Sequence, residues 1–349
     1  MMLHVPLGRL GLVDAFKTAG ANLSASRVHD LAGVLGTLSL GFGLGLANVE
    51  QFKLAVRGNL GPMAGLPAAP EVRTLRRKLY ELSDQIDMTI LIREVARGLL
   101  GMEPAWEGLY FVDGHFSAYT GELAAPKTRH PKKQCASRGR TDTWVHDVQA
   151  RPIFFLTSPI HEQLVSTIPR VVTEIQAVAG EDSRIFLIFD RGGYSAELFE
   201  LLTKLGVDFA TYLKGTPKGY VPPPDSEFRR RYWTFEGKRH WYEIAETELT
   251  LGEYTYRVVV KRDGGKHIPI ITNLRTDNPA KIAHLVKLRW RQENGLKDLV
   301  HNSFIDGIVE YGGDEQPDTT KIPHPEREKL KVELAGVRHQ RVALQAEVG

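Results

Sequence analysis

The 349-residue sequence contains a single cysteine, Cys135. One cysteine excludes an intrachain disulfide, and the absence of a Cys-x-x-Cys pair excludes zinc sites built from paired thiolates. The sequence has no charged segment followed by a long apolar leader, so we expect no secretion signal and a cytoplasmic protein. It also lacks the Gly-x-Ser-x-Gly, Walker, Gly-x-Gly-x-x-Gly and His-Glu-x-x-His motifs, which argues against the enzyme classes that depend on them.

Neither sign of charge dominates, because 45 Lys and Arg stand against 42 Asp and Glu, a net charge of +3. Any surface that binds nucleic acid must therefore be local. Long hydrophobic runs are scarce as well. One uncharged run, residues 31–47, has five glycines among its 17 residues, whereas a spanning helix needs about 20 apolar residues. We expect a buried helix there, with a membrane-associated helix as the alternative.

The apolar pattern changes along the chain. Helical spacing dominates up to residue 104, and beyond it short apolar runs alternate with helical segments, which predicts an α/β fold with a partly parallel sheet. Residues 215–278 contain successive strand patterns, and residues 325–349 have apolar residues near heptad spacing. We therefore expect a helical N-terminal domain (1–104), a first part of the core (105–214), a β-rich insertion (215–278), a final core helix (279–312) and a coiled-coil arm (320–349).

Two apolar runs end in an aspartate. The run RIFLIF ends at Asp190, before Arg191 and two glycines, and LYFV ends at Asp113, followed by a glycine and an alternating run that together predict a hairpin. A carboxylate at the end of a buried strand is costly unless it is paired or binds a cation. Side by side, these two acids would suit Mg²⁺ or Mn²⁺, which prefer hard oxygen ligands.

A third acid lies on the helix predicted for residues 277–302, which Asp277 or Asn278 caps. Arg289 and Glu293 are four residues apart and share a helix face. On an exposed helix this would be a surface ion pair contributing about 0.3–0.5 kcal/mol. The positions above and below the pair are apolar, however, so the face points toward the core. We expect Glu293 to meet the other two acids.

These three contexts resemble the bacterial insertion-sequence DDE transposases, whose core is ribonuclease-H-like. The stretches that carry the resemblance are FVDGHFSAYTGE, FLIFDRGGYSAELFELLTKLGVDF and RWRQENGLKDLVHNSFIDGIVEYG, and the long gap before the last matches members with a β-strand insertion. The resemblance implies a ribonuclease-H-like mixed sheet flanked by helices. It also implies Asp113, Asp190 and Glu293 as ligands of two Mg²⁺ or Mn²⁺ ions, and double-stranded DNA as the partner.

Relatives surround the last acid with a Tyr, an Arg and a Lys. Arg289 matches the Arg, whereas Val286 and Val300 occupy the other two positions. Lys297, one turn after Glu293, is the alternative phosphate contact. Arg191 either offsets the negative charge of the acids or contacts a phosphate. The replacement of the Tyr and the Lys by Val286 and Val300 affects the expected contacts with phosphate and does not affect the three acids.

Basic residues gather in three places. The insertion stretch RRRYWTFEGKRHW combines cations with aromatic rings, so Trp233 or Trp241 either stacks on a DNA base or packs within the sheet. The polar stretch 126–140 either contacts the DNA backbone or is a solvated loop. Arg73, Arg76, Arg77 and Lys78 form a helical face that is either solvated or bound to DNA.

The function that these patterns favour is metal-dependent cutting and joining of DNA at insertion-sequence ends, by a nucleoid-associated homodimer without membrane contact. Two alternatives stay open at this point: a transposase-derived DNA-binding protein without catalytic activity, and another metal-dependent nuclease. His115, two residues after Asp113 on the same strand face, is a further candidate metal ligand.

Overall fold

The structure is a computed structural model that describes residues 8, 10–23, 30–119, 127–129, 136–159, 162–302 and 333–334. Within the last long helix, the side chains of Glu293 and Asp298 are not described. The predicted coiled-coil arm (320–349) except residues 333–334, and residues 126 and 130–135 of the polar stretch 126–140, lie outside the described residues.

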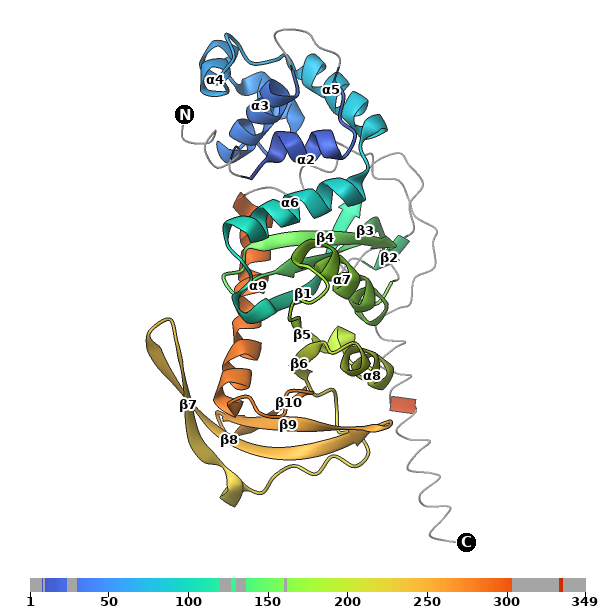
Figure 1. The fold of residues 1–349 in the computed structure, drawn as a ribbon, viewed down its shortest axis with the longest axis vertical. Coiled ribbons are helices and arrows are strands. Elements are labelled where there is room, and N and C mark those ends of the chain that lie inside the picture. The colour runs from blue at the N-terminus through green and yellow to red at the C-terminus, as the bar shows by residue number, and fades with distance from the viewer. Residues whose placement is uncertain are drawn as a thin grey trace.

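The N-terminal part is helical and lies at one end of the molecule (Figure 1). Its elements are α2 (Leu12–Thr18), α3 (Leu31–Gly43), η1 (Val49–Leu54), α4 (Arg57–Met63), α5 (Val72–Gln85) and α6 (Met88–Met102). The uncharged run forms α3, which packs into a small core with Phe52, Leu60 and Leu75. Of the helices described, none has the length and apolarity needed to span a membrane.

The predicted basic face on α5 is smaller than expected. Lys78 is only 3% exposed and pairs with Glu81, so it does not belong to the face. Arg76 binds Glu50 on η1. Arg73 and Arg77 are exposed. The periodicity did not distinguish these positions because a helix of this type buries a stripe wide enough to include the stem of a lysine.

The rest of the described chain forms one ten-stranded mixed sheet with three helices. The strands are β1 (Leu109–Tyr119), β2 (Lys127–Arg129), β3 (Ala136–His146), β4 (Pro152–Pro159), β5 (Phe186–Phe189), β6 (Asp208–Tyr212), β7 (Arg229–Phe235), β8 (Lys238–Leu251), β9 (Tyr254–Asp263) and β10 (Lys266–Thr272). The helices are α7 (Leu164–Ala179), α8 (Ala196–Lys204) and α9 (Pro279–Asn302).

The core of this sheet has the strand order β4-β3-β1-β5-β6. β3 is antiparallel to β1 and to β4, whereas β5 is parallel to β1, and β6 is parallel to β5. Parallel neighbours need crossover connections, which α7 and α8 supply. The predicted ribonuclease-H-like mixed sheet flanked by helices is thus confirmed.

The predicted hairpin around Asp113 is wrong. β1 continues as one strand from Leu109 to Tyr119, and it pairs with β3 from Phe111 to Tyr119 without a break. Gly114 pairs with Thr143 in ordinary ladder geometry, so the glycine does not turn the chain. Asp113 therefore lies within β1, just beyond its last parallel pair with β5.

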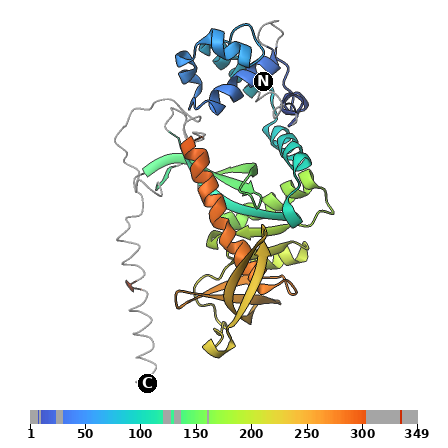
Figure 2. The ribbon, with the colours of Figure 1, turned by 90° about the vertical axis from the view of Figure 1, so that its left-hand side faces the viewer.

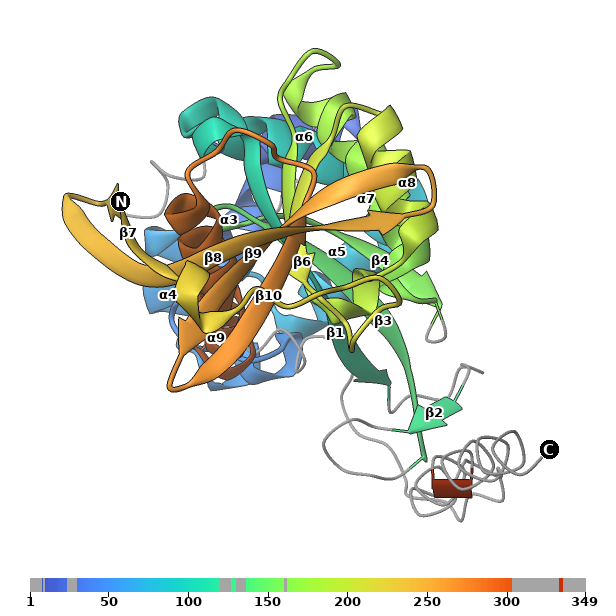
Figure 3. The ribbon, with the colours of Figure 1, turned by 90° about the horizontal axis from the view of Figure 1, so that it is seen from below.

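The β-rich insertion extends the same sheet. β10 pairs antiparallel with β6, and β9, β8 and β7 follow in order (Figure 3). The long strands of this insertion lie at the end of the molecule opposite the N-terminal helices (Figure 1).

Helices cover both faces of the sheet. Tyr110 and Val112 belong to the core cluster under α6, α7 and α8, whereas Leu109 and Phe111 belong to the cluster under α9. α9 runs diagonally across its own face (Figure 2). Because side chains alternate along a strand, odd-numbered residues at the start of β1 face α9.

Candidate active site

Asp113 and Asp190 are neighbours on one face of the sheet. The parallel register pairs Val112 with Phe189, the residues immediately before the two acids. In β5, Phe186 and Ile188 pack under α9, so alternation continues through the extended backbone of Asp190 to the same face. The last parallel pair of β1 and β5, in the middle of β1 and at the carboxyl end of β5, thus brings together the two aspartates that the sequence singled out.

Each carboxylate is oriented by the backbone that follows it. Oδ1 of Asp190 accepts a hydrogen bond from the Gly192 amide (2.7 Å), and Oδ1 of Asp113 accepts one from the Gly114 amide (2.9 Å). A Cβ at Gly192 would lie 2.8 Å from Oδ1 of Asp190, and one at Gly193 would lie 2.6 Å from the Phe189 ring. The two glycines after Asp190 therefore permit the chain to fold tightly around its carboxylate.

α9 brings an arginine to this pair. Asn278 caps the helix through a 2.9 Å bond from the Ala280 amide to its Oδ1, and Ile282 and Leu285 are fully buried against the sheet. One turn farther, Nη1 of Arg289 lies 3.5 Å from Oδ2 of Asp113, and the Arg289 side chain is only 12% exposed. The predicted core-facing stripe of this helix therefore reaches Asp113.

Glu293 lies on the helix turn that follows Arg289. Its backbone belongs to α9, and residues four apart lie on one helix face. Among the side chains that the structure describes, no three His, Cys, Asp or Glu are grouped closely enough to hold a metal. The described carboxylates of Asp113 and Asp190 are oxygen donors on adjacent strands, which fits one side of a Mg²⁺ or Mn²⁺ site.

Sequence reasoning missed Gln292, whose side chain is 1% exposed. Its Nε2 lies 3.0 Å from Nδ1 of His146, 3.4 Å from the Trp144 carbonyl oxygen and 3.5 Å from that of Phe111. Burial lowers the pKa of His146 to about 4, so the ring is neutral and Nδ1 can accept the hydrogen bond. The sequence signal for Gln292 was its position three residues after Arg289, which places it on the helix stripe that faces the sheet.

The other two predicted cations, Arg191 and Lys297, are both exposed. Arg191 is exposed, and its guanidinium carbon lies 5.7 Å from the ring centre of Tyr212, at the end of β6. Lys297 is exposed on α9, one turn beyond Glu293. Tyr212 was not predicted, although its place at the end of the strand next to β5 is a signal for it. His115 lies beyond Asp113 on β1, across from Asp142.

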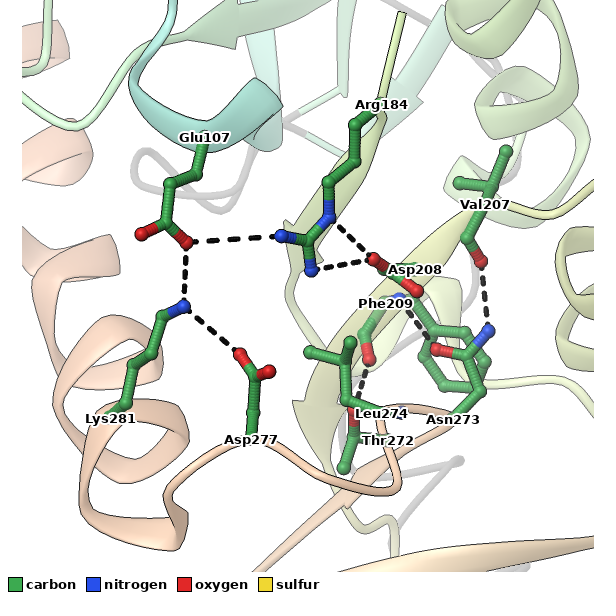
Figure 4. Close-up of polar contacts among 10 residues, drawn as sticks. All are labelled: Glu107, Arg184, Val207, Asp208, Phe209, Thr272, Asn273, Leu274, Asp277 and Lys281. Atoms are coloured by element: carbon green, nitrogen blue, oxygen red, sulfur yellow. Dashed lines mark hydrogen bonds and ion pairs between the residues drawn. The ribbon is translucent and has the colours of Figure 1, made fainter.

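Ion pairs link the elements at the other end of the parallel strands, where β1, β5 and β6 begin (Figure 4). Nζ of Lys281, in the first turn of α9, lies 2.6 Å from Glu107 and 3.0 Å from Asp277, and Arg184 joins Glu107 to Asp208. Burial by itself would lower the pKa of Lys281, but the hydrogen bonds to Glu107 and Asp277 outweigh it and raise that pKa. This network fixes the start of α9 over the beginnings of β1, β5 and β6.

A second contact at this end joins β6 to the segment after β10 (Figure 4). Oδ1 of Asn273 accepts a 2.8 Å hydrogen bond from the Phe209 amide, and its Nδ2 donates to the Val207 carbonyl oxygen at 2.8 Å. The first turn of α9 and the segment that precedes it are therefore both anchored at the end of the strands opposite the acids.

The two candidate tryptophans of the insertion have different surroundings. The Trp233 ring lies 5.8 Å from Trp106, 5.1 Å from Phe235 and 5.3 Å from His284 of α9. This cluster favours the packing alternative for Trp233. Trp241, by contrast, is 45% exposed.

Trp241 belongs to an exposed aromatic and basic face on β7 and β8. Its ring lies 4.8 Å from that of its cross-strand partner Tyr232. The guanidinium of Arg230 lies 4.5 Å from the Trp241 ring, and that of Arg239 lies 5.2 Å from the Tyr232 ring. We call these four residues the hairpin face. It presents two rings flanked by two cations.

Comparison with known proteins gives a family match. The model of a family described as Transposase protein matches residues 5–348. No curated protein matches the chain. Among solved structures, the chain is similar to a piggyBac transposase synaptic complex with hairpin DNA, with TM-score 0.44, 10% identity, and coverage of 84% of this chain and 67% of that one. It is also similar to a Mos1 mariner paired end complex with Mn, with TM-score 0.21, 8% identity, and coverage of 57% and 65%.

Proposed function

Since the chain belongs to this family of transposase proteins, we propose that it is a metal-dependent DDE transposase that cuts and joins DNA at the ends of an insertion sequence. The observation that carries the finer part of this proposal is the register of β1 and β5, which makes Asp113 and Asp190 neighbours on the face that α9 covers. Glu293 completes the proposed set of ligands.

In this proposal the three carboxylates hold Mg²⁺ or Mn²⁺, as two ions. When bound, such ions lower the pKa of an attacking oxygen and offset the charge on the leaving oxygen of a phosphodiester. The protein orients the carboxylates through the amides of Gly114 and Gly192. Arg289, which lies against Asp113, offsets the excess negative charge of the acids and stabilises charge on a bound phosphate.

The proposal predicts that the full-length protein nicks and joins DNA that carries the matching terminal repeats, and only with Mg²⁺ or Mn²⁺ present. The measurement is a strand-transfer assay with labelled ends, and EDTA is expected to abolish both steps because it removes the ions that activate the attacking oxygen. DNA binding without cleavage in either metal would favour the inactive DNA-binding alternative. Cleavage of generic phosphate esters without preference for these ends would favour another nuclease.

The DNA partner in this proposal is double-stranded, as element ends and as target, and a homodimer holds the paired ends. The hairpin face suits such a partner, because arginines bind phosphates and exposed rings stack on bases. The exposure of Trp241 and its cation–π contact with Arg230 support this assignment for Trp241.

We expect Trp241→Ala to weaken binding of terminal-repeat DNA by about 10-fold, since stacking on one base contributes about 1–3 kcal/mol. The thermal midpoint should stay close to that of the wild type because the ring is exposed. Trp233→Ala is the matched control: it empties part of a packed cluster and should destabilise the fold by about 3–5 kcal/mol. The measurements are fluorescence anisotropy with labelled DNA and thermal denaturation. Equal affinity of Trp241→Ala and wild type would remove the hairpin face from the DNA interface.

A further inference from the structure

Gln292 places a polar side chain in the interior, next in sequence to the proposed ligand Glu293. Its three closest polar neighbours all belong to β1 and β3, the strands beside the acids. Phe111 precedes Asp113 by two residues, and Trp144 is the cross-strand partner of Asp113. One amide thus joins α9 to both strands at the level of the acids.

Stability does not account for a glutamine at this position. Within the described part of the chain, Oε1 of Gln292 and Nε2 of His146 are buried without a hydrogen-bond partner. A buried polar atom left without a partner costs about 1–3 kcal/mol, and two of the three contacts of Nε2 are long. The one short hydrogen bond of Nε2, to His146, therefore does little more than offset the cost of burying Oε1, and the amide adds little net stability.

A close contact also holds the helix just after Glu293. A Cβ at Gly295 would lie 3.2 Å from Cβ and 3.3 Å from the carbonyl oxygen of Ala150, in the turn after β3. Glycine in a helix interior costs about 1 kcal/mol relative to alanine. Glycine at position 295 therefore allows α9 to approach the turn after β3 closely.

We propose that Gln292 is a positioning residue, whose amide, held by His146 and by the carbonyl groups of Phe111 and Trp144, sets the depth and rotation of α9 and so presents Glu293 to Asp113 and Asp190. The inference rests on the proposed function. It assigns to Gln292 no contact with DNA or with a reacting atom. The chemistry that requires this precision is the sharing of divalent cations by carboxylates from a helix and from two strands.

The test is Gln292→Met in the full-length protein, because methionine keeps the volume and removes the amide. We expect a thermal midpoint close to that of the wild type, because the lost partner of His146 Nδ1 offsets the removal of the unpaired Oε1. We also expect a Kd for Mn²⁺ raised about 10-fold in calorimetry, and kcat lowered about 10- to 100-fold with the KM for DNA unchanged. Leu296→Met, one turn farther and also buried, makes the same kind of change without touching an amide and should leave all three values unchanged.

The outcomes separate the two proposals. If the wild type binds Mn²⁺ and cuts DNA, and Gln292→Met does both with unchanged constants, the positioning role is wrong while the proposed function stands. If Gln292→Met lowers the thermal midpoint but leaves the Kd for Mn²⁺ unchanged, Gln292 is merely structural and the inference is also wrong. A wild type that neither binds Mn²⁺ nor cuts DNA would overturn the proposed function, and this inference with it.

Discussion

Asp190→Asn should lower DNA cleavage and joining by about 1,000-fold, the upper range for loss of one group that stabilises transition-state charge. Asparagine keeps the shape of the side chain and can still accept the hydrogen bond from the Gly192 amide, so the turn after β5 should persist. What it removes is the negative charge that, in the proposed function, holds a divalent cation between adjacent strands. The measurement is single-turnover cleavage of end DNA in saturating Mn²⁺, together with circular dichroism.

Asp182→Asn is the matched control for this substitution. Asp182 is exposed in the turn before β5, at the opposite end of the same strand, and it should tolerate the change without loss of activity. Robust cleavage by Asp190→Asn would remove this residue from the catalytic machinery. Equal losses in both variants would point to a general effect on the fold.

Glu293→Gln should have an effect of similar size, about 100- to 1,000-fold on cleavage. The backbone places residue 293 one turn after Arg289, which contacts Asp113, and immediately after Gln292, which reaches Phe111 and Trp144. Residue 293 therefore shares a helix face with Arg289, on the side of α9 that contacts Asp113. The same cleavage assay measures it, with DNA affinity determined separately to show that binding survives.

The control for Glu293→Gln is Glu200→Gln on α8. Glu200 makes an i, i+4 ion pair with Lys204 on an exposed helix surface, which is the alternative that the Arg289 and Glu293 spacing left open. Loss of such a pair changes stability by about 0.3–0.5 kcal/mol and leaves chemistry alone. If Glu293→Gln behaves like Glu200→Gln, then the third acid is a surface ion pair and not a ligand.

The elements that were predicted well are those with local signals. The run before Asp190 and the two glycines after it lie within a few residues of one another, and the structure contains both. The cap of α9 is similarly local. The hairpin at Asp113 was predicted wrongly because Gly114 suggested a turn, whereas the long pairing with β3, distant in sequence, keeps β1 straight.

The site was partly visible in the sequence. The acids stood out because a strand-end carboxylate needs a partner, but their adjacency depends on the parallel register of β1 and β5, which no local pattern encodes. Gln292 was missed because an amide in an apolar stripe resembles a surface residue until its neighbours are known. The sequence did contain a signal for the different surroundings of Trp233 and Trp241. Glu236 and Gly237 form a two-residue turn in which both residues have positive φ. This turn sets a register in which Tyr232 pairs with Trp241.

The account depends on three carboxylates sharing divalent cations. The most direct measurement is a crystal structure of the protein with terminal-repeat DNA and Mn²⁺, with anomalous scattering used to locate the manganese. We predict anomalous peaks ligated by Asp113, Asp190 and Glu293, just beyond the last parallel pair of β1 and β5. Manganese bound elsewhere, with any of these side chains directed into solvent, would contradict it.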